Sequence, residues 1–239
     1  MGLPNEFRTI PEDAFRIVDL TAPLNEQSPC YPDDPPFTKT WHILYSKHGL
    51  YVSKLQMGSH SGTHVDAPMH FLGDAHADVA GMPLLQFMGP AIALERLKQP
   101  GEDLTVADLE GEDIRSGDIV LFRTGWDKRA GSPQFFEDEC PGLQPSLVEE
   151  LIRRRVKAIG SDTASVDSPA ALAGGAPAHK LAGRAGVPVY EALVNLDQVT
   201  GQCFYFLGLP LKLEKGEASP VRAVALVPNL NLARMRPPI

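Results

Sequence analysis

The chain has 239 residues, of which 43% are hydrophobic and 22% are charged, and its formal net charge is −8. This length is sufficient for a substantial core in one large α/β domain or barrel, and the composition is that of a soluble globular protein. The acidic balance argues against a nucleic acid as partner, and the absence of an apolar run of ~20 residues argues against a membrane-spanning helix.

In chain order, the N-terminal region predicts extended structure. Residues 1–15 contain no basic segment followed by an apolar one, so no signal peptide is visible and a cytoplasmic location is expected. Residues 15–21 (FRIVDLT) indicate a strand, whereas the Pro-rich arm at about 22–40 indicates extended chain with turns. Residues 51–57 (YVSKLQM) alternate between two faces and predict a strand that leads into a histidine-rich segment.

The remainder of the chain predicts more strands than helices. Short β-branched or aromatic runs bounded by Gly, Pro and Asp indicate strands at 90–97, 118–124, 157–162, 187–193, 203–209 and 221–227. Because these strands do not alternate strictly with helices, the predicted fold class is α/β with a mixed, α+β-like sheet. We expect a single domain over residues 1–239.

Two helices are expected in the second half. In residues 146–155 (SLVEELIRRR), Ser146 and Glu149 match a capping box. Four apolar residues of this segment recur at the spacing of a buried face: Leu147, Val148, Leu151 and Ile152. A shorter helix is expected at residues 177–186, ended by Gly186 and Pro188.

The segment 59–71 (SHSGTHVDAPMHF) concentrates groups that bind metals. His60 and His64 have helical i, i+4 spacing, but the intervening Gly62 and the following Pro68 are poor helix formers. A fully extended chain would place residues 60 and 66 roughly 20 Å apart, whereas ligands must all lie about 2 Å from one ion. We therefore expect a loop that curls at Gly62 and Pro68 to bring its side chains together.

Nitrogen and oxygen are the expected ligand atoms. The three cysteines are widely spaced and odd in number, which indicates reduced thiols: Cys30, Cys140 and Cys203. His42, His48 and His76 fall outside the pattern and are expected to lie outside the site. A site of imidazole and carboxylate without thiolate favours catalysis, because structural zinc usually has closed, thiolate-rich coordination.

The histidine segment resembles a known signature. Seven residues reproduce the pattern HxGTHxDxPxH: His60, Gly62, Thr63, His64, Asp66, Pro68 and His70. This pattern is similar to that of the cyclase-like metal-dependent hydrolases, which include bacterial kynurenine formamidases and isatin hydrolases. Residues 160–169 (GSDTASVDSP) resemble the GxDTxSxD segment of that family, and residues 179–197 resemble its second metal-site segment. The resemblance extends from about Phe15 to Val227.

The resemblance implies a fold, ligands and an assembly. The fold is of the swivelling β/β/α type, with a mixed sheet or barrel-like core flanked by helices. The first-site ligands correspond to His60, His64 and Asp66, and in binuclear members Asp66 bridges to a second site held by His179 and Glu191. His70 corresponds to the general acid and base. The resemblance also implies one or two divalent ions per subunit, zinc or manganese. It further implies a homo-oligomer (dimer or tetramer) with a pocket at the subunit interface.

Aromatic residues are the candidates for substrate binding. Four of them, in the arm and beside the histidines, are expected to form a wall for a flat aryl group: Tyr31, Phe37, Trp41 and Phe71. Aromatic residues more often belong to the core, and this alternative remains open for each of them. The expected partner is therefore a small-molecule substrate.

The resemblance favours hydrolysis of an arylformamide of the N-formylkynurenine type, as in tryptophan catabolism. Two alternatives are the opening of isatin, which is a lactam, and the opening of a dienelactone, which is a lactone. A catalytically silent metal-dependent binding protein would not require His70. A structural metalloprotein would favour cysteine ligands, and a barrel amidohydrolase would require a longer chain with regular strand and helix alternation.

Overall fold

The computed structural model of the protein describes residues 14–28, 30–31, 33–136 and 139–229. The strands are β1 (Phe15–Asp19), β2 (Thr38–Ile43), β3 (Val52–Gln56), β4 (His64–Asp66), β5 (Met88–Glu95), β6 (Ile119–Arg123), β7 (Ala158–Ser161), β8 (Val189–Glu191), β9 (Cys203–Leu207), β10 (Ala218–Pro220) and β11 (Val224–Pro228). The α-helices are α1 (Tyr45–His48), α2 (Met69–Leu72), α3 (Pro145–Arg153), α4 (Pro169–Ala173) and α5 (Pro177–Arg184). Short 3₁₀ helices span Leu84–Phe87, Val106–Leu109, Trp126–Arg129, Pro133–Phe136 and Leu196–Gln198.

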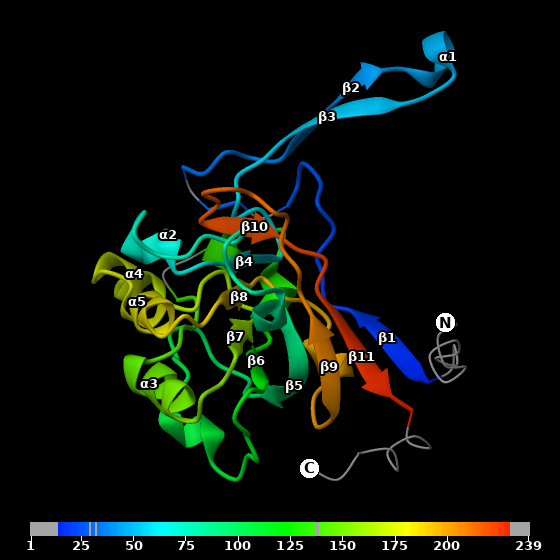
Figure 1. Ribbon diagram of the computed structural model, residues 1–239. Coiled ribbons are helices and arrows are strands. Elements are labelled where there is room, and N and C mark those ends of the chain that lie inside the picture. Colours follow the sequence, from blue (N-terminus) through cyan, green and yellow to red (C-terminus); the bar gives the residue numbers. More distant parts are fainter. Residues whose placement is uncertain (1–13, 29, 32, 137–138, 230–239) are drawn as a thin grey trace, which may run out of the picture.

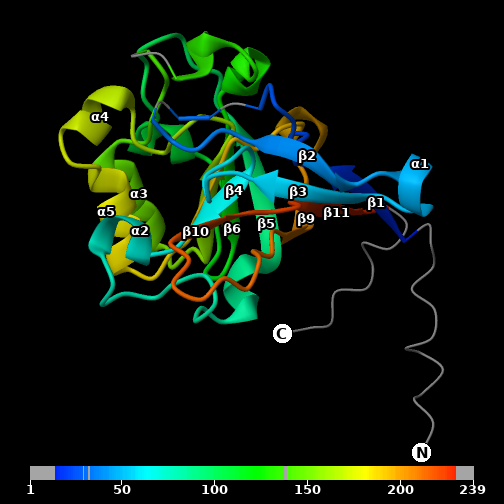
Figure 2. The same ribbon diagram turned by 90° about the horizontal axis from the view of Figure 1, so that it is seen from above.

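The principal sheet has nine strands in the order β1-β11-β9-β5-β6-β7-β8-β4-β10. Its centre, from β5 to β8, is parallel, and the strands on both sides of this centre are antiparallel. This arrangement confirms the predicted mixed sheet. The sheet curls, and helices α2 to α5 gather on one side of it (Figures 1 and 2).

The buried core lies on both faces of this sheet. In β6, Ile119 and Leu121 point into the cluster on the inner face of the curl, whereas Val120 and Phe122 point toward the helices. This two-residue alternation is the geometry of a strand that is buried on both faces, and it explains why 118–124 is a continuous apolar run. On the helical side, α3 and α5 pack on β6, β7 and β8, and each fully buried Leu or Val there contributes about 1.5–3 kcal/mol.

The strands β2 and β3 form a separate two-stranded sheet. This hairpin carries α1 at its tip and projects away from the principal sheet (Figure 1). Its register places Trp41 opposite Ser53 and Thr38 opposite Gln56. The predicted strand at 51–57 is therefore present, but most of its side chains are exposed.

Each of the eight predicted strands and both predicted helices has a counterpart in the structure. The buried face of α3 is also confirmed, with Leu147, Val148 and Leu151 buried. The predicted capping box at Ser146 is wrong, because the helix begins at Pro145 with Gln144 as N-cap and without a side-chain cap. Proline is well suited to the first helical position, where its missing N–H costs no hydrogen bond.

The histidine segment differs from the predicted loop in its centre. His64–Asp66 is strand β4, paired with β8 on one side and β10 on the other. Both predicted curls are present: Gly62 has a left-handed backbone with φ of 63°, and Pro68 is the N-cap of α2.

In the described part of the chain, no helix combines the length and apolarity needed to cross a membrane.

Candidate metal centre

The register of the sheet brings three potential ligands together. His64 and Asp66 are two residues apart on β4 and therefore point to the same face. Glu191, the last residue of β8, lies directly opposite His64 in the antiparallel pair, where side chains are neighbours. As a result, His64 Nε2 lies 3.4 Å from Asp66 Oδ1 and 3.4 Å from Glu191 Oε2, and all three residues are buried.

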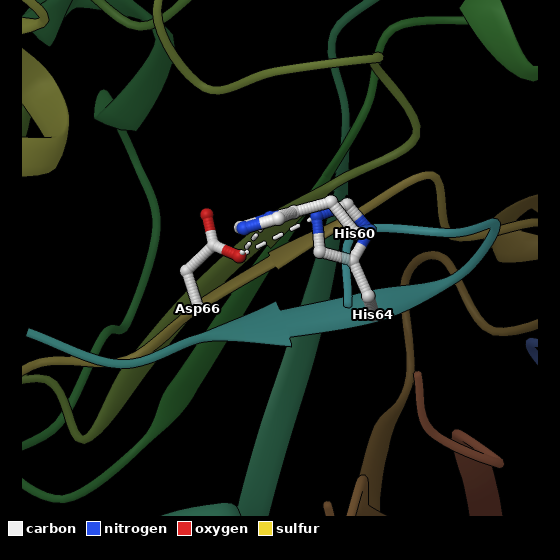
Figure 3. A group of neighbouring side chains, drawn as sticks. All are labelled: His60, His64 and Asp66. Carbon is white, nitrogen blue, oxygen red and sulfur yellow. Dashed lines mark ion pairs between the residues drawn. The ribbon is translucent and has the colours of Figure 1, made fainter. Parts of the chain in front are cut away.

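A tight turn before β4 brings in a second imidazole. Because Gly62 has a left-handed backbone, the chain reverses and His60 folds back over the strand. A Cβ at this position would also lie 2.8 Å from the Leu24 side chain. The His60 Nδ1 atom lies 3.0 Å from Asp66 Oδ1, and Figure 3 shows the rings of His60 and His64 beside this carboxylate.

The fifth ligand candidate comes from helix α5. His179 Nε2 lies 3.3 Å from Asp66 Oδ2 and 3.0 Å from Glu191 Oε1. The other nitrogen of this ring, Nδ1, lies 2.7 Å from Oδ2 of Asp167, a fully buried carboxylate. Asp167 also accepts the backbone N–H groups of Ala178 and His179, so it holds both the first turn of the helix and the orientation of the ring.

The hydrogen bonds at Nδ1 of His64 and His179 determine what the other nitrogen of each ring can do. His64 Nδ1 lies 2.8 Å from the Gly62 carbonyl oxygen, which can only accept, so the proton of this ring is on Nδ1. By the same argument, the proton of His179 faces Asp167. In the neutral form of each ring, Nε2 therefore presents a lone pair to the carboxylates of Asp66 and Glu191.

Three of these acceptor atoms lack a hydrogen-bond donor in the described part of the chain. Within the described residues, His64 Nε2 and both oxygens of Asp66 are buried without a hydrogen-bond partner. Buried polar atoms without partners are costly, and a divalent cation would satisfy them together. Ligand atoms of His60, His64 and Asp66 lie within 4.8 Å of one another, as do those of Asp66, His179 and Glu191. These residues therefore fit one ion or two ions that share Asp66.

The electrostatics of the site agree with this interpretation. Burial opposes a charge on His64, yet the nearby Asp66 and Glu191 carboxylates raise its pKa to about 9. Burial likewise opposes a charge on His179, but Asp167, Asp66 and Glu191 raise its pKa well above the ordinary value. The buried carboxylates thus attract positive charge into the site, and a metal ion supplies it without protonating the ligands.

His70 lies beside the ligands without belonging to either group. It is on helix α2, and its ring lies 4.1 Å from that of His60, centroid to centroid. Its Nε2 is 3.9 Å from Asp66 Oδ2, and its side chain is more exposed than those of His64 and His179. Burial lowers the pKa of His70, which favours the neutral ring that can accept a proton.

A cavity of about 310 Å³ opens onto this cluster. Five of its lining residues come from the metal cluster and its neighbour: His60, His64, His70, His179 and Glu191. The others are Tyr31, Asp34, Phe71, Phe136, Ala164, Ser165 and Leu172. The volume is within the range of small-molecule sites, and the wall is mainly apolar with a few polar groups.

Of the predicted substrate-binding residues, Tyr31 and Phe71 line the cavity. Phe37 and Trp41 are not part of its lining, and Trp41 is on the hairpin, where it is 51% exposed. His42 and His48 are also in the hairpin region, and His76 follows α2; none of these three belongs to a ligand group.

The residues of the site that were not singled out from the sequence include Asp167, Phe136 and Asp34. Asp167 lies in the segment 160–169, and the similarity of this segment to a family motif was the sequence feature that could have identified it. Phe136 lines the cavity and contacts Tyr31 edge-on, with ring centroids 5.7 Å apart. Neither Phe136 nor Asp34 has a local sequence signal, because Phe136 ends a short 3₁₀ helix (Pro133–Phe136) and Asp34 lies in a loop.

Comparison with known proteins identifies close similarities. Residues 18–168 match a family model described as Putative cyclase. An isatin hydrolase from Roseibium aggregatum is 33% identical, over 89% of this chain and 92% of that protein. A kynurenine formamidase from Bordetella avium is also 33% identical, over 87% of this chain and 97% of its own length. The structure of isatin hydrolase A from Ralstonia solanacearum matches with a TM-score of 0.81 at 31% identity, covering 89% of this chain and 92% of that chain.

Proposed function

Because this chain belongs to the putative cyclase family, we propose that it is a metal-dependent hydrolase that opens the amide bond of a small aromatic molecule. This proposal rests on one observation. Around Asp66, next to a cavity, buried acceptor atoms that have no hydrogen-bond donor lie together with the other potential ligands. Hydrolysis adds the hydroxyl group of water to the carbonyl carbon and a proton to the nitrogen as the C–N bond breaks. An arylformamide would give formate and an arylamine.

Two substrate types have support. An arylformamide is the first candidate, because of the resemblance to kynurenine formamidases at 33% identity. A cyclic aryl amide of the isatin type is the second, because isatin hydrolases are similar to this chain in sequence and in structure. Both substrates present an aromatic ring next to a carbonyl group, and the aromatic wall formed by Tyr31, Phe71 and Phe136 suits such a ring.

The residues around the cluster have separate roles in this reaction. His60, His64 and Asp66 would hold one divalent ion, and Asp66, His179 and Glu191 a second. A divalent ion in such a site lowers the pKa of a coordinated water and polarises a carbonyl group. His70, neutral and next to the cluster, accepts the proton of the attacking water and returns it to the leaving nitrogen.

Zinc or manganese is the proposed ion. The described ligand groups contain imidazole and carboxylate but no thiolate. Imidazole suits zinc, and the mixture with carboxylates also suits manganese. Since Asp66 is common to both groups, we propose that it bridges when two ions are present.

Removal of the metal is expected to abolish hydrolysis. After dialysis against a chelator, turnover of formanilide and of isatin should fall by about a hundredfold or more, because the nucleophile is no longer activated. Addition of zinc or manganese should restore it. Metal content measured by mass spectrometry and steady-state rates on both compounds provide the test. An unchanged rate in metal-free protein would refute the metal-dependent reaction, and tight metal binding without turnover would indicate a silent binding protein.

We also propose that the protein is a homo-oligomer. The β2–β3 hairpin pairs with no other strand of the described chain, and a lone hairpin is marginally stable in water. Large apolar side chains are exposed along it and around its tip: Trp41, Leu44, Tyr45, Leu50, Tyr51, Val52 and Leu55. A surface of this kind is typical of an interface, and the resemblance to oligomeric relatives supports a second copy of this chain as its partner.

Charges placed in the aromatic cluster of the hairpin should dissociate the oligomer. Trp41 and Tyr51 lie 4.6 Å apart, ring centroid to ring centroid, and are 51% and 59% exposed. The double variant Trp41→Glu/Tyr51→Glu is expected to weaken association by about a hundredfold or more, since loss of one aromatic hot spot typically costs about 2 kcal/mol. Analytical ultracentrifugation measures the effect. The matched variant Trp41→Phe/Tyr51→Phe should remain associated, and a monomeric wild-type protein would contradict the proposal.

A further inference from the structure

The three imidazoles of the candidate metal centre are held in different ways. In His64 and His179, the nitrogen that faces away from the carboxylate cluster lies next to a buried acceptor, at 2.8 Å and 2.7 Å respectively. Such an outer acceptor is usual for a histidine that binds metal, because it fixes the tautomer and the orientation of the ring. The third ring, His60, is more exposed, at 17% against 5% for His64 and 3% for His179. His60 is therefore the ring that most needs an orienting partner.

A carboxylate faces the far edge of the His60 ring. The Nδ1 atom of His60 lies 3.0 Å from Asp66 Oδ1, and its Nε2 atom lies 3.7 Å from Oε1 of Glu217. Glu217 belongs to neither of the two potential ligand groups. At 3.7 Å the contact is electrostatic and is longer than a direct hydrogen bond. A negative charge at this edge of the ring favours the tautomer that carries its proton on Nε2.

The sheet fixes the backbone of Glu217 beside the histidine segment. Glu217 immediately precedes β10, in which Ala218 lies opposite Asp66 in the antiparallel pair with β4. The carbonyl oxygen of Glu217 accepts the backbone N–H of Ala67 at 2.8 Å, so the pairing continues past the end of β4. Figure 1 shows β10 next to β4. The position of Glu217 is thus set by strand pairing.

Ser59 holds the Glu217 carboxylate at this position. The Ser59 hydroxyl donates a hydrogen bond to Oε1 of Glu217, the same oxygen that faces His60. Burial opposes the charge on Glu217, but the Ser59 hydroxyl and the nearby His60 ring lower the pKa of the carboxyl below its ordinary value. Because Ser59 directly precedes His60 in the chain, the hydroxyl, the carboxylate and the imidazole form one connected unit.

We propose that Glu217 is a positioning residue of the first metal site, and that its carboxylate, held by Ser59, orients His60 with Nε2–H toward Glu217 and the Nδ1 lone pair toward Asp66. This inference rests on the proposed function and concerns the binding of its metal. A histidine must present an unprotonated nitrogen to a cation, but the Asp66 carboxylate attracts the proton of the ring to Nδ1. Glu217 opposes this attraction from the other edge, so it favours the tautomer that can bind the ion.

The zinc affinity of the metal-free protein tests the role of Glu217. Loss of an outer partner of a metal-binding histidine typically lowers metal affinity by about 10–100-fold. We expect the lower end, about tenfold, for Glu217→Gln, because the contact is long and the Glu217 side chain is 40% exposed. Glu214→Gln is the matched control, since it removes the same charge from an exposed residue of the same loop, and it should retain the wild-type affinity. Competition with a chromophoric chelator measures each dissociation constant.

Ser59→Ala distinguishes orientation from the effect of charge alone. This variant keeps every carboxylate but removes the hydroxyl that holds Glu217. Zinc binding should weaken by about threefold, the size expected for one modest hydrogen bond. In the Glu217→Gln background the same change should have no further effect, because the charge that Ser59 positions is already absent. Wild-type affinity in Ser59→Ala would show that Glu217 acts only as a nearby charge, and the positioning role would be overturned.

The ring nitrogens of His60 provide a readout that does not depend on affinity. In zinc-loaded wild-type protein labelled with ¹⁵N-histidine, NMR should show a metal-bound Nδ1 and a protonated Nε2 for His60. Metal at Nε2 would overturn the inference, and this measurement decides the matter should Glu217→Gln not fold. Equal zinc affinity in Glu217→Gln and the wild type would refute the role of Glu217 while the amide hydrolase stands. A wild-type protein that binds neither zinc nor manganese would remove the proposed function itself.

Discussion

Replacement of Asp66 by asparagine is expected to remove the bound metal and to lower kcat/KM for amide hydrolysis by at least about a thousandfold. Asp66 is the residue shared by both potential ligand groups. Its Oδ1 lies 3.0 Å from His60 Nδ1, and its Oδ2 lies 3.3 Å from His179 Nε2. Asparagine has the same shape but no charge, and its NH₂ group cannot bind a cation, so both metal positions are weakened at once.

Metal content after dialysis and steady-state kinetics measure this effect. Asp19→Asn is a suitable control, because it also neutralises a carboxylate, but one that pairs with Arg222 at the surface, away from the metal cluster. It should keep full metal content and rate. An Asp66→Asn protein that binds metal as tightly as the wild type would show that the site is held by other residues.

The candidate metal centre was only partly predictable from the histidine segment itself. The turns at Gly62 and Pro68 were correctly expected, because their backbone preferences are local properties. The expectation of a loop between them was wrong, since His64–Asp66 is a strand. Three residues are too few to give an alternating pattern, and the partner strands β8 and β10 lie more than a hundred residues away in the chain.

The second half of the cluster depends on tertiary structure. From the residues alone, His179 and Glu191 were an ordinary histidine and an ordinary carboxylate, and only the resemblance implied that they bind metal. They meet because β8 pairs with β4 and α5 packs on the same sheet. Asp167 completes this arrangement through the first turn of α5. Contacts of this kind are set by sheet order and helix packing, which local periodicity does not encode.

The aromatic residues illustrate the same limit. Tyr31 and Trp41 belong to neighbouring parts of the N-terminal region and have the same chemical character, yet Tyr31 lines the cavity and Trp41 is on the hairpin. The alternating pattern of 51–57 correctly indicated a strand, but it did not show that this strand leaves the body of the protein. Whether a strand joins the main sheet is decided by its partners, and here β3 pairs only with β2 within the described chain.

Replacement of His70 by alanine is expected to lower kcat by about 10²–10⁴-fold while the metal stays bound. The ring lies next to the cluster, 3.9 Å from Asp66 Oδ2, but it belongs to neither ligand group. Its loss therefore removes the group that transfers the proton and leaves the ligands in place. Because the His70 side chain is 27% exposed, water can fill the vacated space and the fold should be maintained.

Parallel measurement of metal content and kcat separates this role from that of a ligand. His76→Ala is the matched control, because it removes an exposed imidazole six residues further along the chain that belongs to neither ligand group. It should leave both quantities unchanged. A His70→Ala protein with the wild-type rate would exclude His70 from proton transfer, and one that loses the metal would make His70 a ligand. Retained metal with a strongly reduced kcat is the result that only a proton-transfer role explains, since KM for the aryl amide should change little.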